Sequence, residues 1–212
     1  SITGYHQRNI ILNFLTSPQF TSDNFKEEIE RFYGTISEKN KFTTQNILST
    51  WDTPRIASIL NNTNLLKLGI ALQFTLPGIP AIYYGDEAGM TGGMDPDNRR
   101  PFQYGIIDTD IFIYYQKLSS LRNNHPVLKT GEIEFYIDDK FPDIITYKRF
   151  SESDEIIIML NRSSLEVQYL LNKEILTKNH ITKIIDLTTG EIIDYKEGKI
   201  IFKPYQCYVL KY

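Results

Sequence analysis

The sequence predicts an α/β fold for residues 1–125 and an all-β fold for residues 126–212. Three observations indicate this division. Apolar residues before His125 recur mainly at the spacing of amphipathic helices. One nearly unbroken apolar run, Ile79–Tyr84, lies between two glycines and is typical of a strand that is buried on both faces of a parallel sheet. After Pro126 the period changes, and short β-branched or aromatic segments alternate with turn residues.

The composition excludes several kinds of function. The chain has 212 residues, of which 41% are hydrophobic, and this is enough for a substantial core. The formal net charge of −3 gives no indication of nucleic acid or of a membrane surface as a partner. A single cysteine, Cys207, and three scattered histidines exclude a disulfide framework and a Cys/His metal site. No apolar run is long enough to span a bilayer, and we expect neither a metal nor a redox cofactor.

Helices and strands alternate in the first part of the chain. Its strand–helix–strand portion forms a βαβ unit, which is right-handed by default and has the length of one repeat of a (β/α)8 barrel. The elements are predicted as helices over Ile10–Leu15 and Ser22–Tyr33, a strand over Phe42–Thr50, a helix over Leu65–Phe74, the strand Ile79–Tyr84, and a helix over Ile111–Leu121 that closes at His125-Pro126.

The second part of the chain predicts an antiparallel β-sandwich, because many short strands follow one another at close and regular spacing. Turn residues such as Thr189-Gly190 separate them. The predicted strands are Glu132–Ile137, Ile144–Phe150, Glu155–Leu160, Glu166–Leu170, Ile181–Leu187, Ile192–Tyr195, Lys199–Phe202 and Cys207–Leu210.

A polar, glycine-rich loop follows the apolar run Ile79–Tyr84. Such a loop at the carboxyl end of a buried strand is where α/β proteins place their sites. The loop also carries a long, specific motif, Gly85-Asp86-Glu87-x-Gly89-Met90-Thr91-Gly92-Gly93-x-Asp95-Pro96-Asp97-Asn98-Arg99-Arg100-Pro101. This motif resembles the loop after barrel strand eight in glycoside hydrolase family 13, the α-amylase family. It is most similar to the branch of neopullulanases, cyclomaltodextrinases and maltogenic amylases.

The resemblance implies a fold for the whole chain. Residues 1–125 would be the C-terminal portion of a catalytic (β/α)8 TIM barrel, from after strand six through helix eight, and residues 126–212 the C-terminal β-sandwich domain. We therefore expect the chain to be a C-terminal fragment. In the fragment alone, the side chains of Ile47, Leu48, Ile82 and Tyr84 are expected to lack partners, so self-association through the incomplete barrel is expected unless upstream residues are present.

A second motif in the resemblance lies at the end of the predicted strand Phe42–Thr50. The run from Asn46 to Asp52, followed by Thr53-Pro54-Arg55, resembles the family motif at barrel strand seven. The resemblance places Asp52 as the third carboxylate, which stabilises the oxocarbenium-like transition state. Trp51 departs from the family pattern, which has a histidine that hydrogen-bonds the sugar. An indole has one donor and no acceptor, so Trp51 would bind substrate by stacking on a sugar face or would fill space.

The strand-eight loop supplies two further candidates. The resemblance places Asp95 and Arg99 as residues that bind sugar hydroxyls on the non-reducing side, and their acceptors and donors suit a polyhydroxyl ligand. An internal salt bridge between them is the alternative, and it is compatible with binding. Asp86 and Glu87 are expected to support the base of the loop, and Asp97 and Arg100 to shape it.

The implied parent protein is a retaining α-glucan glycoside hydrolase. It would cut α-1,4 glucosidic bonds in maltodextrins, cyclodextrins or pullulan-like glucans, and cleavage of α-1,6 bonds as well is left open. By analogy with its branch it would be cytoplasmic. In the family the nucleophile (Asp) and the acid/base (Glu) lie upstream of the first residue here, so this chain alone is expected to be inactive. Two alternatives remain open. One is a non-catalytic, glucan-binding homologue, which Trp51 favours, and the other is a transglycosidase of the same family.

Overall fold

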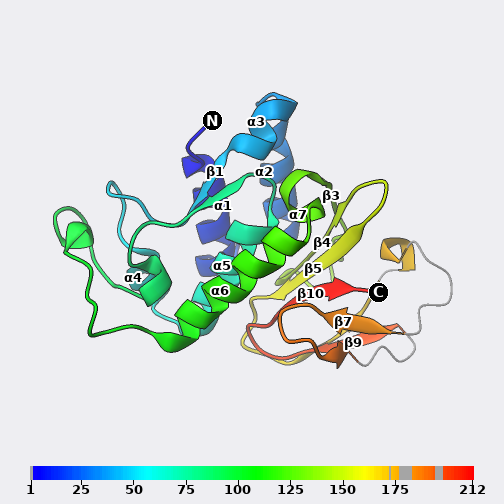
Figure 1. Cartoon of the computed structure of the whole chain (residues 1–212). Coiled ribbons are helices and arrows are strands. Elements are labelled where there is room, and N and C mark those ends of the chain that lie inside the picture. The colour runs from blue at the N-terminus through cyan, green and yellow to red at the C-terminus, as the bar shows by residue number, and fades with distance from the viewer. Residues whose placement is uncertain (1, 172, 177–182, 194–197) are drawn as a thin grey trace.

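The computed structural model describes residues 2–171, 173–176, 183–193 and 198–212 (Figure 1). Helices gather on one side of the molecule and antiparallel strands on the other. The helices are α1 (Tyr5–Thr16), α2 (Ser22–Gly34), α3 (Glu38–Thr43), α4 (Ile56–Leu60), α5 (Thr63–Thr75), α6 (Thr109–Asn124) and α7 (Val127–Thr130). Three single turns of 3₁₀ helix are η1 (Asp86–Ala88), η2 (Asp97–Arg99) and η3 (Lys173–Ile175).

The predicted parallel pair forms, but both of its strands are shorter than expected. Strand β1 (Gln45–Ile47) pairs in parallel with β2 (Ile79–Ala81). The predicted strand Phe42–Thr50 was wrong at its start, because Phe42 lies in α3. The Ser37 hydroxyl caps that helix by accepting a bond from the Asn40 amide at 3.4 Å.

The prediction that Ile79–Tyr84 is buried on both faces is wrong in this structure. The side chains of Ile79, Ile82 and Tyr84 are 50%, 44% and 40% exposed. Among the described residues β2 has β1 as its partner, and no strand covers its other edge. At the end of β1, in contrast, Leu48 is fully buried. The prediction that side chains of the incomplete barrel lack packing partners is therefore wrong for Leu48 and agrees with the exposure of Ile82 and Tyr84 after β2.

Helix α5 lies at the centre of the helical part and is buried on most of its surface. Asn62 caps it by accepting bonds from the Asn64 and Leu65 amides at 2.9 and 3.1 Å. A Cβ at Gly69 would approach Leu15 Cδ1 to 3.3 Å, which shows how closely α5 packs on α1. The helix therefore provides a rigid support under β1 and β2.

The second part contains two antiparallel sheets, as predicted. A six-stranded sheet has the order β3-β4-β5-β10-β7-β8, and a two-stranded sheet pairs β6 with β9. Residues 181–182 and 194–195, which the sequence assigned to strands, lie outside the described residues. The strands are β3 (Glu132–Phe135), β4 (Ile144–Phe150), β5 (Glu155–Asn161), β6 (Val167–Leu170), β7 (Ile184–Asp186), β8 (Ile192–Ile193), β9 (Lys199–Phe202) and β10 (Cys207–Lys211).

The six-stranded sheet is buried on both faces at its centre. One face carries Ile145, Tyr147 and Ile158, which share a single core with helices α1, α2, α5 and α6. The other face carries Met159, which packs with Tyr169 of β6 in a second cluster. The helical and β parts are therefore joined by a common core, and neither part covers its own apolar surface alone.

Two buried arginines, Arg149 and Arg162, also join the two parts. Arg149 of β4 is fully buried and donates to the main-chain oxygens of Thr75 (2.5 Å), Gly131 (2.7 Å), Leu128 (3.1 Å) and Glu132 (3.3 Å). Burial lowers the pKa of Arg149 to about 10, so the guanidinium keeps its charge at neutral pH. Arg162 likewise bonds the main-chain oxygens of Phe14, Ser17 and Pro18. Arg122 of α6 makes similar bonds to Phe74 and Gly78 within the helical part.

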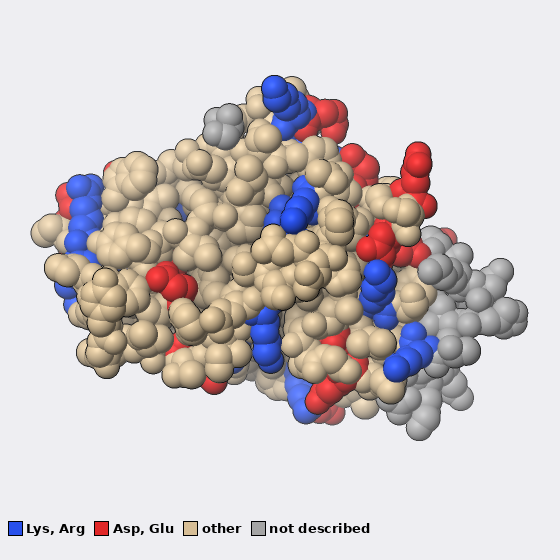
Figure 2. All heavy atoms as spheres, in the orientation of Figure 1, with Lys and Arg blue, Asp and Glu red and all other residues tan. Residues whose placement is uncertain are grey.

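The surface shows no extended field of one charge on the face drawn in Figure 2, where basic and acidic side chains are interspersed among uncharged ones. Among the described residues, no helix is long and apolar enough to cross a membrane.

Candidate functional site

The loop that follows β1 carries Trp51 and Asp52 in a tight turn. Thr50 shapes the turn, because its hydroxyl accepts a bond from the Asp52 amide at 3.1 Å and its amide donates to the Thr53 hydroxyl at 3.0 Å. The Asp52 side chain is 54% exposed. Its Oδ2 accepts a bond from the hydroxyl of Tyr5, in the first turn of α1, at 3.1 Å. The turn thus presents a carboxylate at the surface and orients it from one side.

The loop that follows β2 brings Asp95 and Arg99 to the same place. Arg99 Nε lies 3.1 Å from Asp95 Oδ1 and also donates to the Trp51 main-chain oxygen at 3.1 Å. Arg99 Nη2 lies 3.9 Å from Asp52 Oδ1. The structure therefore brings the four residues chosen from the sequence together around one guanidinium. Asp95 and Arg99 form the internal ion pair considered as an alternative, and both side chains remain about half exposed.

Trp51 extends from this cluster into solvent. Its side chain is 58% exposed, although an indole gains most from burial. In this structure, therefore, the ring fills no buried space. A half-exposed aromatic ring beside two carboxylates and a guanidinium is instead typical of a surface that stacks on a flat apolar partner such as a sugar face.

The neighbouring charges shape the second loop. Asp97 Oδ2 accepts a bond from the Gly93 amide at 2.5 Å, and Asp97 Oδ1 lies 3.1 Å from Arg100 Nε. Glu87 Oε2 accepts a bond from the Gly85 amide at 2.8 Å, where φ is +87°. These contacts fit the supporting positions expected for Asp97, Arg100 and Glu87.

Sequence reasoning missed a buried polar group beneath the two loops. Arg55 is fully buried and donates to the Tyr84 main-chain oxygen at 2.7 Å and to Asp86 Oδ1 at 3.3 Å. Its guanidinium lies 4.7 and 4.8 Å from the ring centroids of Tyr83 and Tyr84. Arg55 stands at the end of the strand-seven motif, and that position was the available signal. The group ties the end of β2 to the base of the loop after β1.

Burial raises the pKa of the Asp86 carboxyl to about 7, against opposing contributions from the Ser49 hydroxyl and from Arg55. This pKa lies above the value of 3.8 for an unfolded Asp, so the folded protein keeps a proton that the unfolded chain has already released. The free energy of unfolding therefore has its full value at acid pH, below the unfolded pKa. It decreases as the pH rises from there through the folded pKa of about 7. Asp86 is 2% exposed, so it acts on the loop rather than on a ligand in solvent.

The four surface residues include two carboxylates, Asp52 and Asp95. A retaining glycosidase needs two carboxyl groups that flank the bond, one as nucleophile and one as acid. Asp52 and Asp95 instead face a single guanidinium, that of Arg99, at 3.9 Å and 3.1 Å. Among the described residues, no three His, Cys, Asp or Glu side chains are grouped to hold a metal ion.

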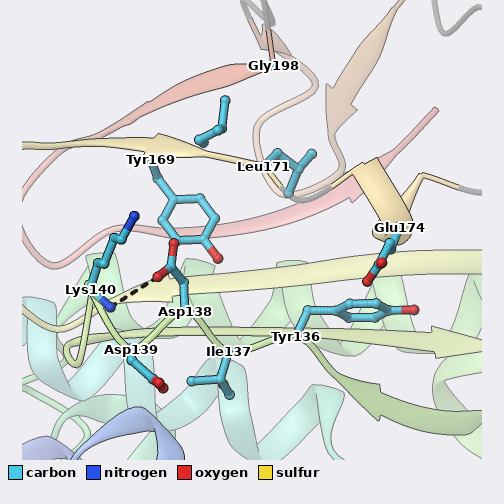
Figure 3. Close-up of a pocket in the computed structure, with 10 residues that line it drawn as sticks. Tyr136, Ile137, Asp138, Asp139, Lys140, Tyr169, Leu171, Glu174 and Gly198 are labelled. Atoms are coloured by element: carbon cyan, nitrogen blue, oxygen red, sulfur yellow. Dashed lines mark hydrogen bonds between the residues drawn. The ribbon is translucent and has the colours of Figure 1, made fainter.

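A hollow of about 750 Å³ lies elsewhere, in the β part (Figure 3). Tyr136, Asp138, Tyr169 and Glu174 are among its lining residues. None of the four residues chosen from the sequence lines it. The candidate site therefore rests on the two exposed loops and not on this hollow.

Comparison with known proteins identifies the class. Residues 7–107, which include both loops, match the family described as Alpha amylase, catalytic domain. Over the whole chain, the sequence is 31% identical to a cyclomaltodextrinase of Thermoanaerobacter pseudethanolicus and spans 36% of that enzyme. Over 63% of the chain it is 35% identical to an amylopullulanase of Thermoanaerobacter thermohydrosulfuricus and spans 11% of it. These relatives are glycoside hydrolases. The chain belongs to the α-amylase family, glycoside hydrolase family 13, as its motifs predicted.

The solved structures agree with this assignment. A maltogenic amylase from S. marinus superposes on 98% of the chain with a TM-score of 0.81 and 28% sequence identity, and the chain spans 28% of that protein. The structural match extends well beyond residue 107, so it includes the β part as well as the helical part.

Proposed function

We propose that the chain is part of a retaining glycoside hydrolase that cleaves α-1,4 glucosidic bonds. Cleavage of α-1,6 bonds by the same enzyme is the broader form of this proposal. The names of the relatives, cyclomaltodextrinase and amylopullulanase, support an α-glucan substrate. The observation that carries the proposal is the arrangement around Arg99, which holds Asp95, lies near Asp52 and bonds the main chain of Trp51. We take residues 1–125 as the barrel portion and 126–212 as the β-domain of a longer parent protein.

In this proposal Asp52 stabilises the transition state. Glycosidic cleavage passes through an oxocarbenium-like ion, so a fixed negative charge near the ring lowers its free energy. Asp52 has that charge at the surface, and Tyr5 donates to its Oδ2 while Oδ1 faces Arg99 at 3.9 Å. The nucleophile and the acid would come from other parts of the parent protein.

Asp95, Arg99 and Trp51 would bind the sugar. Asp95 supplies acceptors and Arg99 a fork of donors, and both are exposed enough to reach a ligand while they remain paired. Trp51 would stack on a sugar face.

A non-catalytic, glucan-binding homologue is the second candidate. One observation favours it: Trp51 stands where the family has a histidine, and an indole cannot accept a hydrogen bond. A stacking surface next to Asp95 and Arg99 would bind glucan without any contribution to cleavage.

We further propose that the chain self-associates when it is isolated. The exposed Ile79 and Ile82 line a groove of about 510 Å³ beside the uncovered edge of β2. An apolar strand edge of this kind pairs readily with another chain. Light scattering that shows a stable monomer would contradict this proposal.

The isolated 212-residue chain is expected to hydrolyse no α-glucan. A carboxylate that only stabilises charge cannot replace a nucleophile and an acid, each of which contributes orders of magnitude to the rate. The measurement is reducing-sugar release from maltodextrin and cyclodextrin by purified chain. Release that disappears in an Asp52→Ala control would show that the chain carries a complete active site and that the proposed division of roles is wrong.

The variant Trp51→His, made in the parent protein, is expected to raise kcat/KM about 5- to 150-fold. One regained hydrogen bond to a sugar hydroxyl contributes about 1–3 kcal/mol, which corresponds to that range. Trp51→Phe is the matched control, because it keeps a ring but restores no hydrogen bond. An unchanged or lower kcat/KM for the histidine variant would identify Trp51 as an adapted stacking surface and would favour the second candidate.

A further inference from the structure

Asn98 is buried in a loop that is otherwise largely exposed. Its side chain is 0% exposed, whereas those of Asp95 and Arg99 on the same loop are 56% and 46% exposed. Burial of an amide costs free energy unless its polar atoms are bonded. The Asn98 amide nitrogen is bonded, whereas its Oδ1 is buried with no hydrogen-bond partner among the described residues. The bonds of the nitrogen must therefore offset the cost of burying the oxygen.

The Asn98 carboxamide bonds the loop that carries Trp51 and Asp52. Its Nδ2 donates to the main-chain oxygens of Trp51 at 2.8 Å and Thr53 at 2.9 Å, with Thr50 O at 3.4 Å. All three partners are acceptors, so only the amide nitrogen can face them, and the orientation of the group is determined. We call the Asn98 side chain with the Trp51 and Thr53 oxygens the amide clasp.

Neighbouring contacts hold the two loops at the same place as the amide clasp. The Trp51 oxygen also accepts a bond from Arg99 Nε at 3.1 Å, so consecutive residues of one loop hold a single carbonyl of the other. Gly92 permits this approach, because a Cβ there would lie 2.9 Å from Asn98 Cα and 2.8 Å from the Asp97 oxygen. Beside it, the Arg55 amide donates to the Gly92 oxygen at 3.0 Å.

We propose that Asn98 is a positioning residue that holds the loop of Asp52 in register with the loop of Asp95 and Arg99. Arg99 also links the two loops, through one bond to the Trp51 oxygen, whereas Asn98 bonds the oxygens of both Trp51 and Thr53. The geometric part of the proposal stands on these contacts alone. Its consequence for catalysis rests on the function proposed above.

The variant Asn98→Ala in the 212-residue chain tests the geometric part. Trp51 is the only tryptophan of the chain, so its fluorescence reports on this loop alone. Loss of the clasp is expected to lower the Trp51 anisotropy, to increase acrylamide quenching and to speed hydrogen exchange of the Asp52 and Thr53 amides at least 10-fold. Exchange in β5 should not change. Asn124→Ala, which removes an exposed amide bonded to Ser120, is the control. Unchanged fluorescence and unchanged exchange would overturn the proposal.

Gly92→Ala perturbs the amide clasp from its other side and leaves Asn98 in place. Its added Cβ must displace the main chain of residues 97–98, so the same Trp51 signals should change in the same direction. If both variants fail to fold, native-state exchange of the unmodified chain decides. The amides of Thr53 and Arg99, which lie on opposite loops, should then open with one common free energy. Separate openings would contradict the proposal.

Kinetics of Asn98→Ala in the parent protein test the catalytic part. A displaced Asp52 should lower kcat by at least 10-fold with a smaller change in KM, because the charge acts mainly in the transition state. Altered Trp51 signals with unchanged kcat would support the amide clasp and would contradict the role proposed for Asp52. Lower kcat with unchanged Trp51 signals would reject the clasp.

Discussion

Asp52→Asn in the parent protein is expected to lower kcat by at least about 100-fold, with a much smaller effect on substrate binding. The substitution keeps the shape of the side chain and an oxygen that can accept the Tyr5 hydroxyl bond, but it removes the negative charge. That charge matters most when the sugar ring becomes cationic, so the loss should fall on kcat.

Steady-state kinetics on a soluble maltooligosaccharide would measure this effect. Asp110→Asn is the matched control, because Asp110 is an exposed carboxylate that pairs with Lys67, 3.7 Å away, and makes no contact with Arg99 or Trp51 that the structure records. If kcat of the Asp52 variant equals that of the control, the third carboxylate lies elsewhere and the assignment is wrong.

Arg149→Ala is expected to lower the free energy of unfolding by at least about 3 kcal/mol, because several main-chain oxygens lose a charged donor inside the core. For a chain of this size that corresponds to a fall in Tm of about 6–12 °C. The loss should appear in helical and β signals together, since Arg149 of β4 bonds Thr75 at the end of α5.

Thermal unfolding followed by circular dichroism would measure this loss. Arg31→Ala is the control, because Arg31 is 63% exposed and pairs with Glu28 at the surface, where an ion pair contributes about 0–1 kcal/mol. Equal stability of the two variants would show that the bonds of Arg149 to the main chain contribute little. Separate melting of the two parts would show that the common core does not couple them.

The structure brings together the residues that the two sequence motifs indicated. Asp52 and Asp95 are 43 positions apart, and only the resemblance indicated that they would meet. Asn98 and Arg55 were missed as buried groups, because each is a polar residue in a polar segment, Asn98 in the glycine-rich loop and Arg55 in the turn after β1, and such segments have the composition of a solvated surface. Their burial depends on carbonyls that point inward from the other loop, and no local pattern records that direction.

The fold was predicted where local signals act alone. Helix α6 and strand β4 follow from periodicity and β-branched composition, and their ranges agree closely with the structure. Strand β1 was predicted too long because the apolar Phe42 resembles a strand residue, although the Ser37 cap continues a helix through it. The exposure of Ile82 could not be read from its apolar neighbours, because burial of a strand depends on the elements around it.

Arg162 of the β part bonds the main-chain oxygens of Phe14 and Ser17 at the end of α1, and this contact sets an order of events during synthesis. The two ends of the contact are separated by almost 150 residues of chain. At about 5–20 residues per second, a ribosome needs about 7–30 s to pass from one to the other. Through that interval the apolar faces of α1 and α5 are without the sheet that later covers them. Holdase chaperones would therefore be expected to bind nascent chains that end before residue 162, and to release those that have passed it.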